Sequence, residues 1–307
     1  AGGKGGRRAR AAAKRRDEAA VAAREAELAA GDTLPESAAD FERLLVASPN
    51  SSFLWVQYVA WQLSVGEVEA ARGVVERALA TISFRSEEER LNVWVALLNL
   101  EHRYGDRASL AAAFARALRH CDPKAVHLRM LSIYARTGHL EEAEALHAIT
   151  AGKFAAAKKV WLRWMEGRFK AGDADGARAL LPKALAALPK RKHVAVITRL
   201  AILEYHNGSA EQGRTLLDNV IATMPKRLDL WSVYLDQESG AHGDEAAARR
   251  LFERATAQRW STKKMRFLFR KWHAFESKLG ARGDTEAVAE AARRYVQAQG
   301  ADDRDAQ

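Results

Sequence analysis

The chain has 307 residues with six prolines, is 48% hydrophobic and carries a formal net charge of +10. No apolar run approaches the roughly eighteen residues needed to cross a bilayer, so we expect a soluble protein without membrane contact. A single cysteine, Cys121, excludes an internal disulfide and a multi-thiolate metal site, which is typical of a reducing compartment. The first residue is not Met, and we expect a part of a longer protein.

The positive charge is concentrated in two segments. Residues 1–16 contain no acid and seven cations, which are Lys4, Arg7, Arg8, Arg10, Lys14, Arg15 and Arg16. Residues 259–282 contain one acid, Glu276, and eight cations, which are Arg259, Lys263, Lys264, Arg266, Arg270, Lys271, Lys278 and Arg282. The remainder is slightly acidic. This distribution indicates acidic partners near the two ends of the chain rather than along its body.

Three regions follow one another along the chain. Residues 1–30 combine glycines and basic residues with an Ala/Arg/Glu stretch that lacks an apolar stripe, which predicts a largely disordered basic arm leading into a marginal helix. Residues 31–300 form a repeat array, and residues 301–307 a polar tail.

Large residues mark the repeats at spacings of 33 to 39 residues. They are Trp55, Trp94, His127, Trp161, Ile197, Trp231 and Phe269. Three residues after each anchor comes a second large apolar residue: Tyr58, Leu97, Met130, Trp164, Leu200, Tyr234 and Trp272. Residues spaced by three share one face of a helix, so each pair predicts an amphipathic first helix.

Glycines predict where these first helices end, at Gly66, Gly105, Gly138, Gly172, Gly208, Gly243 and Gly280. A second helix follows, with an Ala-Arg step such as Ala71-Arg72, Ala177-Arg178 or Ala248-Arg249 and a run resembling Phe252-Glu253-Arg254-Ala255. Phe41-Glu42-Arg43-Leu44 is such a run without a preceding first helix. The array therefore starts with half a repeat and continues with about seven helix pairs.

Local signals predict helix starts and one interruption. Ser86 with Glu89, and Ser209 with Gln212, match capping boxes, and Pro35 and Pro123 suit first-turn positions. We expect Pro182 to interrupt a second helix. Together the patterns predict an all-α fold, a right-handed superhelical solenoid of antiparallel helix pairs.

The combination of Trp, Tyr three residues later, Glu seven residues later, Gly, Ala-Arg and Phe-Glu-Arg-Ala resembles the half-a-TPR (HAT) repeats of RNA-processing proteins. The resemblance covers roughly residues 36 to 299. Glu36 to Pro49, Ser51 to Trp55 and Leu91 to Glu101 are similar to the C-terminal repeat module of the ribosomal RNA processing protein five family. In that family tandem S1 RNA-binding domains precede the repeats. The resemblance implies a nucleolar role in early small-subunit precursor assembly.

The residues give no support for catalysis, a metal site or a cofactor. His139 and His147 stand eight residues apart, which is not a metal-ligand spacing. Carboxylates recur seven residues after the anchors at Glu101, Glu204, Glu238 and Glu276. We interpret them as partners of an arginine on the second helix of the same pair. The anchors Trp55, Tyr58, Trp94, Trp161, Trp164, Trp231, Tyr234, Phe269 and Trp272 could stack on bases, but their periodicity favours a structural core.

Two functional hypotheses remain. In the first, the chain is a non-catalytic scaffold for protein subunits of a nucleolar pre-ribosomal particle, with precursor ribosomal RNA or small nucleolar RNA nearby. Alternatives are a scaffold of an mRNA 3′-end processing or splicing complex, or a direct RNA-binding module. The candidate RNA or acidic-partner contacts are Arg7, Arg8, Arg10, Lys14, Arg15, Arg16, Lys263, Lys264, Arg266, Arg270, Lys271 and Lys278. Homodimerisation stays open.

Overall fold

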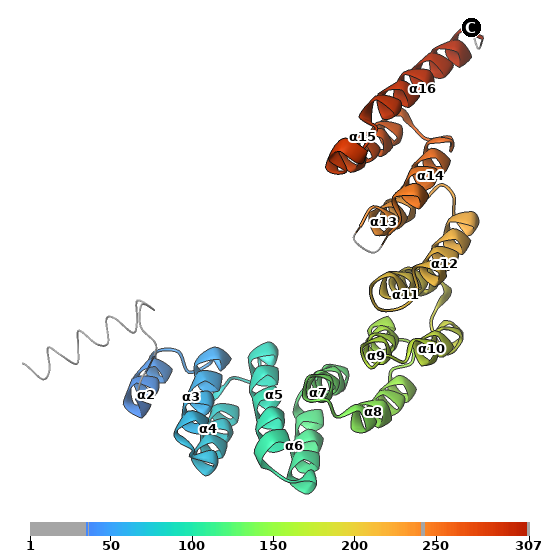
Figure 1. The fold of residues 1–307 in the computed structure, drawn as a ribbon. Coiled ribbons are helices and arrows are strands. Elements are labelled where there is room, and N and C mark those ends of the chain that lie inside the picture. The colour runs from blue at the N-terminus through green and yellow to red at the C-terminus, as the bar shows by residue number, and fades with distance from the viewer. Residues whose placement is uncertain (1–34, 36, 241–242, 306–307) are drawn as a thin grey trace, which may run out of the picture. The chain divides into compact units, whose positions relative to one another are not determined.

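A computed structural model describes residues 35, 37–240 and 243–305, and these residues form helices connected by short loops (Figure 1). The predicted all-α class is confirmed, with no strand in the described part of the chain. None of the described helices is both long and apolar enough to cross a bilayer. The basic arm at residues 1–30, with Arg7, Arg8, Arg10, Lys14, Arg15 and Arg16, lies outside the described residues.

The chain divides into two compact units, residues 1–146 and 147–307, and the division falls within α8. The helices that begin in the first unit are α2 (Ala38–Ala47), α3 (Ser52–Val65), α4 (Val68–Thr81), α5 (Glu87–Tyr104), α6 (Arg107–His120), α7 (Pro123–Thr137) and α8 (Leu140–Lys153). Those of the second unit are α9 (Lys158–Lys170), α10 (Ala174–Ala187), α11 (His193–Asn207), α12 (Ala210–Thr223), α13 (Leu228–Glu238), α14 (Glu245–Thr256), α15 (Thr262–Lys278) and α16 (Thr285–Asp305).

In the described residues, α2 is followed in the first unit by the antiparallel pairs α3/α4 and α5/α6, and the second unit contains the pairs α9/α10, α11/α12, α13/α14 and α15/α16 (Figure 1). Within each unit, first helices also contact one another, as α3 does α5 and α9 does α11. The last helix runs through Asp305, so the first five residues of the segment expected to be a polar tail continue α16.

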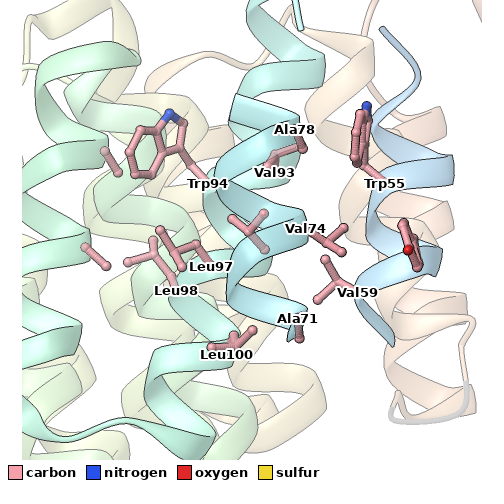
Figure 2. Close-up of a cluster of buried hydrophobic side chains, with 14 of the residues drawn as sticks. Trp55, Val59, Ala71, Val74, Ala78, Val93, Trp94, Leu97, Leu98 and Leu100 are labelled. Atoms are coloured by element: carbon pink, nitrogen blue, oxygen red, sulfur yellow. The ribbon is translucent and has the colours of Figure 1, made fainter. Parts of the chain in front are cut away.

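Buried apolar side chains from α2 to α7 form the core of the first unit, and Figure 2 shows the part that α3, α4 and α5 contribute. They include Trp55 and Val59 of α3, Ala71, Val74 and Ala78 of α4, and Val93, Trp94, Leu97, Leu98 and Leu100 of α5. The alanines are fully buried because they face the neighbouring helices where these approach closely. In the second unit, Trp231, Leu235, Phe252 and Leu268 belong to the corresponding cluster.

The indole groups of Trp55 and Trp231 are hydrogen-bonded to the backbone as well as buried. The Nε1 of Trp55 donates to the carbonyl of Pro49 at 2.9 Å, and the Nε1 of Trp231 donates to that of Pro225 at 2.9 Å. An arginine of the second helix covers each ring, with Arg77 at 5.6 Å from the Trp55 centroid and Arg254 at 5.8 Å from that of Trp231. Each anchor thus fixes the loop before its own helix.

Three local predictions need correction. Neither Ser86 nor Ser209 caps its helix through its side chain, and the Glu89 carboxylate instead accepts from the Ser52 amide at 2.6 Å. Pro35 precedes α2 by more than one residue, whereas Pro123 does begin α7. Pro182 lies within an unbroken α10, on its exposed side, because Leu180 and Ala184 beside it are buried and hold the helix against its neighbours.

Candidate interaction surfaces

Four repeats contain a buried carboxylate bound to an arginine. The pairs are Arg72 with Glu101, Arg178 with Glu204, Arg214 with Glu238, and Arg249 with Glu276, and in each the guanidinium donates to both carboxylate oxygens at 2.7 to 3.1 Å. The glutamates are at most 6% exposed. The arginine comes from the second helix of the preceding repeat, so the expected pairing within one helix pair is wrong. The pair joins successive repeats.

The glycine after such a glutamate has a packing role. A Cβ on Gly208 would lie 2.3 Å from Oε2 of Glu204, and a Cβ on Gly105 would lie 2.2 Å from Oε2 of Glu101. The backbone therefore approaches the carboxylate more closely than any other residue type permits. Only some of the predicted stops use a left-handed backbone, as Gly66 does at φ 91°.

Arginine pairing lowers the pKa of two of these carboxylates. The arginine hydrogen bond holds the pKa of Glu101 below its ordinary value, and Arg249 does the same for Glu276. The arginines Arg72 and Arg178 have raised pKa values, mainly through the same hydrogen bonds. A carboxylate held ionised by a bidentate partner is not poised to transfer a proton near neutral pH. Among the described residues no group of three or more His, Cys, Asp or Glu side chains is arranged to hold a metal ion.

The motif Phe-Glu-Arg-Ala forms a second set of links, between successive second helices. Arg77 donates to both carboxylate oxygens of Glu42 at 2.7 Å, and Arg116 binds Glu76 at 2.7 and 2.8 Å. In the second unit Arg254 binds Asp218 at 2.9 Å. The Glu of one repeat therefore meets the Arg of the next. These pairs are about half exposed, so each contributes little stability by itself.

The predicted aromatic anchors lie in the core. Exposure is below 10% for Trp55, Tyr58, Trp94, Trp161, Trp164, Trp231, Tyr234 and Trp272, while Phe269 is half-buried beside Trp272. Side chains at this depth have no face open to an RNA base. These residues therefore offer no exposed ring on which a base could stack.

A groove on the first unit is lined by the first helices α3, α5 and α7 and has a volume of about 700 Å³. Its floor is apolar, with Val56, Ala60, Leu63, Ala96 and Leu100. No sequence motif marks these positions. The one signal in the sequence is that α3 contains no charged residue over fourteen positions.

The rim of this groove carries cations and histidines, and none of its lining residues is acidic. Arg136 donates to Oδ1 of Asn99 at 2.6 Å, and Arg103 lies over the ring of Tyr104. His102 and His139 both contact Oγ1 of Thr137, at 2.9 and 3.0 Å. Burial and the neighbouring His139 lower the pKa of His102. The rim suits a segment that presents carboxylates beside aliphatic side chains.

The second predicted surface is the basic face of α15, which packs its other face through Met265, Leu268 and Trp272. Five of the six predicted cations are exposed: Lys263, Lys264, Arg266, Arg270 and Lys278. Lys264 lies over the ring of Trp260 at 5.3 Å. Phe267, on the same side, is 37% exposed.

Lys271 differs from the other five. Its side chain is 19% exposed, and its Nζ binds Oδ1 of Asp236 at 2.7 Å and Oγ of Ser232 at 2.6 Å. Both partners belong to α13, so Lys271 fastens α15 to the first helix of the preceding repeat. We therefore place it outside the proposed contact surface.

The antiparallel pairs, buried anchors and short connections define a tetratricopeptide-type helical-repeat protein. The tetratricopeptide repeat family model matches residues 168–234. A solved tetratricopeptide repeat protein from Parabacteroides merdae aligns over 78% of this chain and 96% of its own at 16% identity, with a TM-score of 0.36.

Curated relatives extend over most of the chain. The mouse protein RRP5 homolog is 41% identical over 86% of this chain, and the rRNA biogenesis proteins RRP5 of Schizosaccharomyces pombe and Arabidopsis thaliana are each 40% identical over 86% and 85%. Over most of its length the chain is therefore similar to one segment of these RRP5 proteins, in agreement with the resemblance that the repeat pattern indicates. It spans only about one-seventh of these relatives, covering 14% of the mouse protein, 16% of the fission yeast protein and 14% of the Arabidopsis protein.

Proposed function

We propose that the chain is a non-catalytic scaffold in ribosomal RNA processing and small-subunit (pre-18S) ribosome assembly. It holds protein subunits of a nucleolar pre-ribosomal particle, with precursor ribosomal RNA or small nucleolar RNA close by. The names of the relatives, rRNA biogenesis proteins, support the process. The observation that carries the scaffold role is the groove on α3, α5 and α7, which is open, apolar at its floor and free of acids among its lining residues.

The groove suits a protein segment better than a substrate. Helix faces with aliphatic floors bind apolar side chains of a partner, and a cationic rim orients acidic flanks. The rim groups contact one another through Thr137 and Asn99, so they are ordered before a partner arrives. Such preorganisation lowers the entropic cost of binding.

A substitution on the groove floor tests this role. Ala60 is exposed and lines the groove, so Ala60→Glu places bulk and negative charge there without disturbing the core. We expect crosslinking mass spectrometry of the native particle to show that this variant loses the crosslinks between partner proteins and the segments of α5 and α7 near Asn99 and Arg136. Ala112→Glu, on the exposed side of α6, is the control and should retain them. Equal crosslinks in both variants would remove the groove from the scaffold role.

A second candidate function, direct contact with RNA, is supported by the basic face of α15. Lys263, Arg266 and Arg270 are exposed and have no ion pair within the described part of the chain. A helix face with cations and no acid suits phosphates, and its binding should weaken steeply with salt. Replacing these three residues with Gln and measuring RNA affinity across a salt series tests the contact. An unchanged slope would leave this face as solvated surface.

A further inference from the structure

One edge of the second unit is made of the connections that lead from a second helix to the next first helix. The two helices of each pair run in opposite directions, so every connection from a second helix to the next first helix lies at the same end of the helices (Figure 1). These connections are residues 154–157, 188–192, 224–227 and 257–261. The first two connections touch, since Nζ of Lys192 donates to the carbonyl of Ala156 at 2.8 Å. The four connections therefore follow one another along one edge of the second unit.

Each connection, together with the first turn after it, carries at least two exposed cations. They are Lys158 and Lys159, Lys190 and Arg191, Lys226 and Arg227, and Arg259, Lys263 and Lys264. The same stretches contain one acid, Asp229, which pairs with Arg227. We call these nine residues the basic edge.

The equivalent connections of the first unit have the opposite balance. Arg85, Arg90 and Lys124 are their cations, against the four acids Glu87, Glu88, Glu89 and Asp122. Both units build their connections on the same helix pairs, with Trp55 and Trp231 bonded to the preceding loop in the same way. The repeat architecture therefore does not require cations at these positions, and the basic edge is a property of the second unit.

The connections of the basic edge are held in place. Trp161 donates to the carbonyl of Ala155 at 2.8 Å, and Trp231 donates to that of Pro225 at 2.9 Å. His193 contacts the carbonyl of Leu188, and Trp260 donates to that of Ala255, each at 2.8 Å. The backbone that carries the cations is thus fixed, so a ligand orders side chains only.

The composition of the edge favours a phosphate backbone over an acidic protein. No large apolar side chain in these four connections is exposed, whereas stable protein interfaces have an apolar centre. Trp260 is half-buried and Lys264 lies over its ring at 5.3 Å, so it offers no free platform for a base. Adjacent first helices pack roughly 8 to 10 Å apart, so four connections span roughly 30 Å.

We propose that the basic edge binds an RNA strand through its phosphates, without reading its bases. The choice of RNA as the polyanion rests on the proposed role in ribosomal RNA processing. The edge extends the contact from α15 across the three preceding repeats of the second unit. Lys263 and Lys264 belong to both surfaces, which makes α15 the end of a longer track.

The test uses the whole chain and a labelled 20-nucleotide oligouridylate. The edge variant carries Lys158→Gln, Lys190→Gln, Arg191→Gln and Lys226→Gln, which leaves α15 intact. The control removes the same charge from exposed positions of the first unit through Arg85→Gln, Arg107→Gln, Arg119→Gln and Arg129→Gln. A third variant carries Lys263→Gln, Arg266→Gln and Arg270→Gln. Circular dichroism melts confirm that each folds.

We expect the edge variant to bind more weakly and to lose roughly 2 to 3 from the slope of log affinity against log salt, at roughly 0.7 per phosphate contact, while the control keeps the parental slope. Equal losses in edge variant and control would overturn the proposal, because net charge alone would then explain them. So would poly-glutamate competing as well as RNA at equal charge. If only the α15 variant loses affinity, the basic edge fails and the α15 contact stands. If no variant loses affinity, both fail.

Discussion

Arg178 of α10 and Glu204 of α11 form a bidentate pair in which Nε and one terminal nitrogen reach the two carboxylate oxygens at 2.7 and 2.8 Å. The partners differ in burial: the Glu204 side chain is fully buried, and the Arg178 side chain is 32% exposed and also binds Asp175. The loss in free energy of unfolding on removing the arginine should therefore differ from the loss on removing the glutamate.

We expect Arg178→Ala to lower the free energy of unfolding by about 3 kcal/mol, because it leaves a buried carboxylate with only the Ser209 amide at 3.1 Å. Glu204→Ala should cost less, since the arginine can turn to solvent and Asp175. Urea unfolding measures both. Arg227→Ala, which removes an exposed pair with Asp229, is the control and should stay within about 0.5 kcal/mol of the parent. Equal costs for Arg178→Ala and Glu204→Ala would contradict the asymmetry.

Acid should weaken the array through its buried glutamates. The arginine hydrogen bonds lower the pKa of Glu101 and Glu276 in the folded chain, so the folded state binds fewer protons than the unfolded state. This contribution to stability is present above the unfolded value of 4.5 and is lost as the pH falls through the folded pKa. Thermal melts between pH 6 and pH 3 should show a shallower decline for Glu101→Gln than for the parent. Parallel curves would exclude this carboxylate as a source of acid sensitivity.

Truncating a buried anchor should destabilise the fold without a direct effect on binding. Trp94 is 2% exposed and stacks on His120 with ring centroids 5.7 Å apart. We expect Trp94→Ala to cost about 3 to 5 kcal/mol, as buried aromatic truncations do. Phe53→Ala, which removes an aromatic ring that is 66% exposed, should change stability by less than about 0.5 kcal/mol. Unchanged melting of Trp94→Ala with lost partner binding would make this tryptophan a contact residue.

Two adjacent cations on α15 offer a matched comparison. Lys271→Gln breaks the bonds to Ser232 and Asp236 and should lower stability by about 1 kcal/mol while leaving the RNA salt slope unchanged. Arg270→Gln removes the same charge from an exposed position and should reduce the slope by roughly 0.7 with parental stability. Urea unfolding and salt-titrated filter binding together distinguish the two. Identical behaviour would mean that α15 cations act only through total charge.

The basic arm remains a prediction from sequence. Deleting residues 1–16 removes seven cations without apolar periodicity, so we expect unchanged melting and weaker RNA association at low salt. The measurement is filter binding of the deleted and complete chains over the same salt series. Matching affinities at every salt concentration would take the arm out of the RNA contact.

Periodicity made the helix pairs and the core residues predictable. A Trp with an apolar residue three positions later has one low-energy arrangement in a repeat array, and Trp231 with Tyr234 illustrates it. Interactions between repeats were harder to predict from the sequence. Glu101 lies 29 residues after Arg72, and sequence spacing cannot say whether an arginine of its own helix pair or of the preceding one will reach it. Glu89 likewise binds Ser52 of the preceding repeat instead of capping its own helix.

The candidate surfaces also differ in how far the sequence predicts them. The exposed cations of α15 follow from helical periodicity alone, but Lys271 shares their pattern and is bound to α13. The basic edge could not be predicted from the sequence, because its cations are spread over four short connections. Each connection by itself resembles an ordinary solvated loop. The groove on α3, α5 and α7 requires three helices to be placed side by side before its floor exists.

The arginine–glutamate pairs between repeats should also determine which repeats unfold together. At the carboxylate position α7 has Tyr134 and α9 has Arg168, while α5, α11, α13 and α15 have the paired glutamate. Stability in stacked repeats is a sum of local and nearest-neighbour contributions. Repeats clamped to their predecessor should therefore open together, and α7 should open at lower free energy than α5. Amide hydrogen exchange would then reveal cooperative blocks whose limits follow the placement of glutamate rather than the count of repeats.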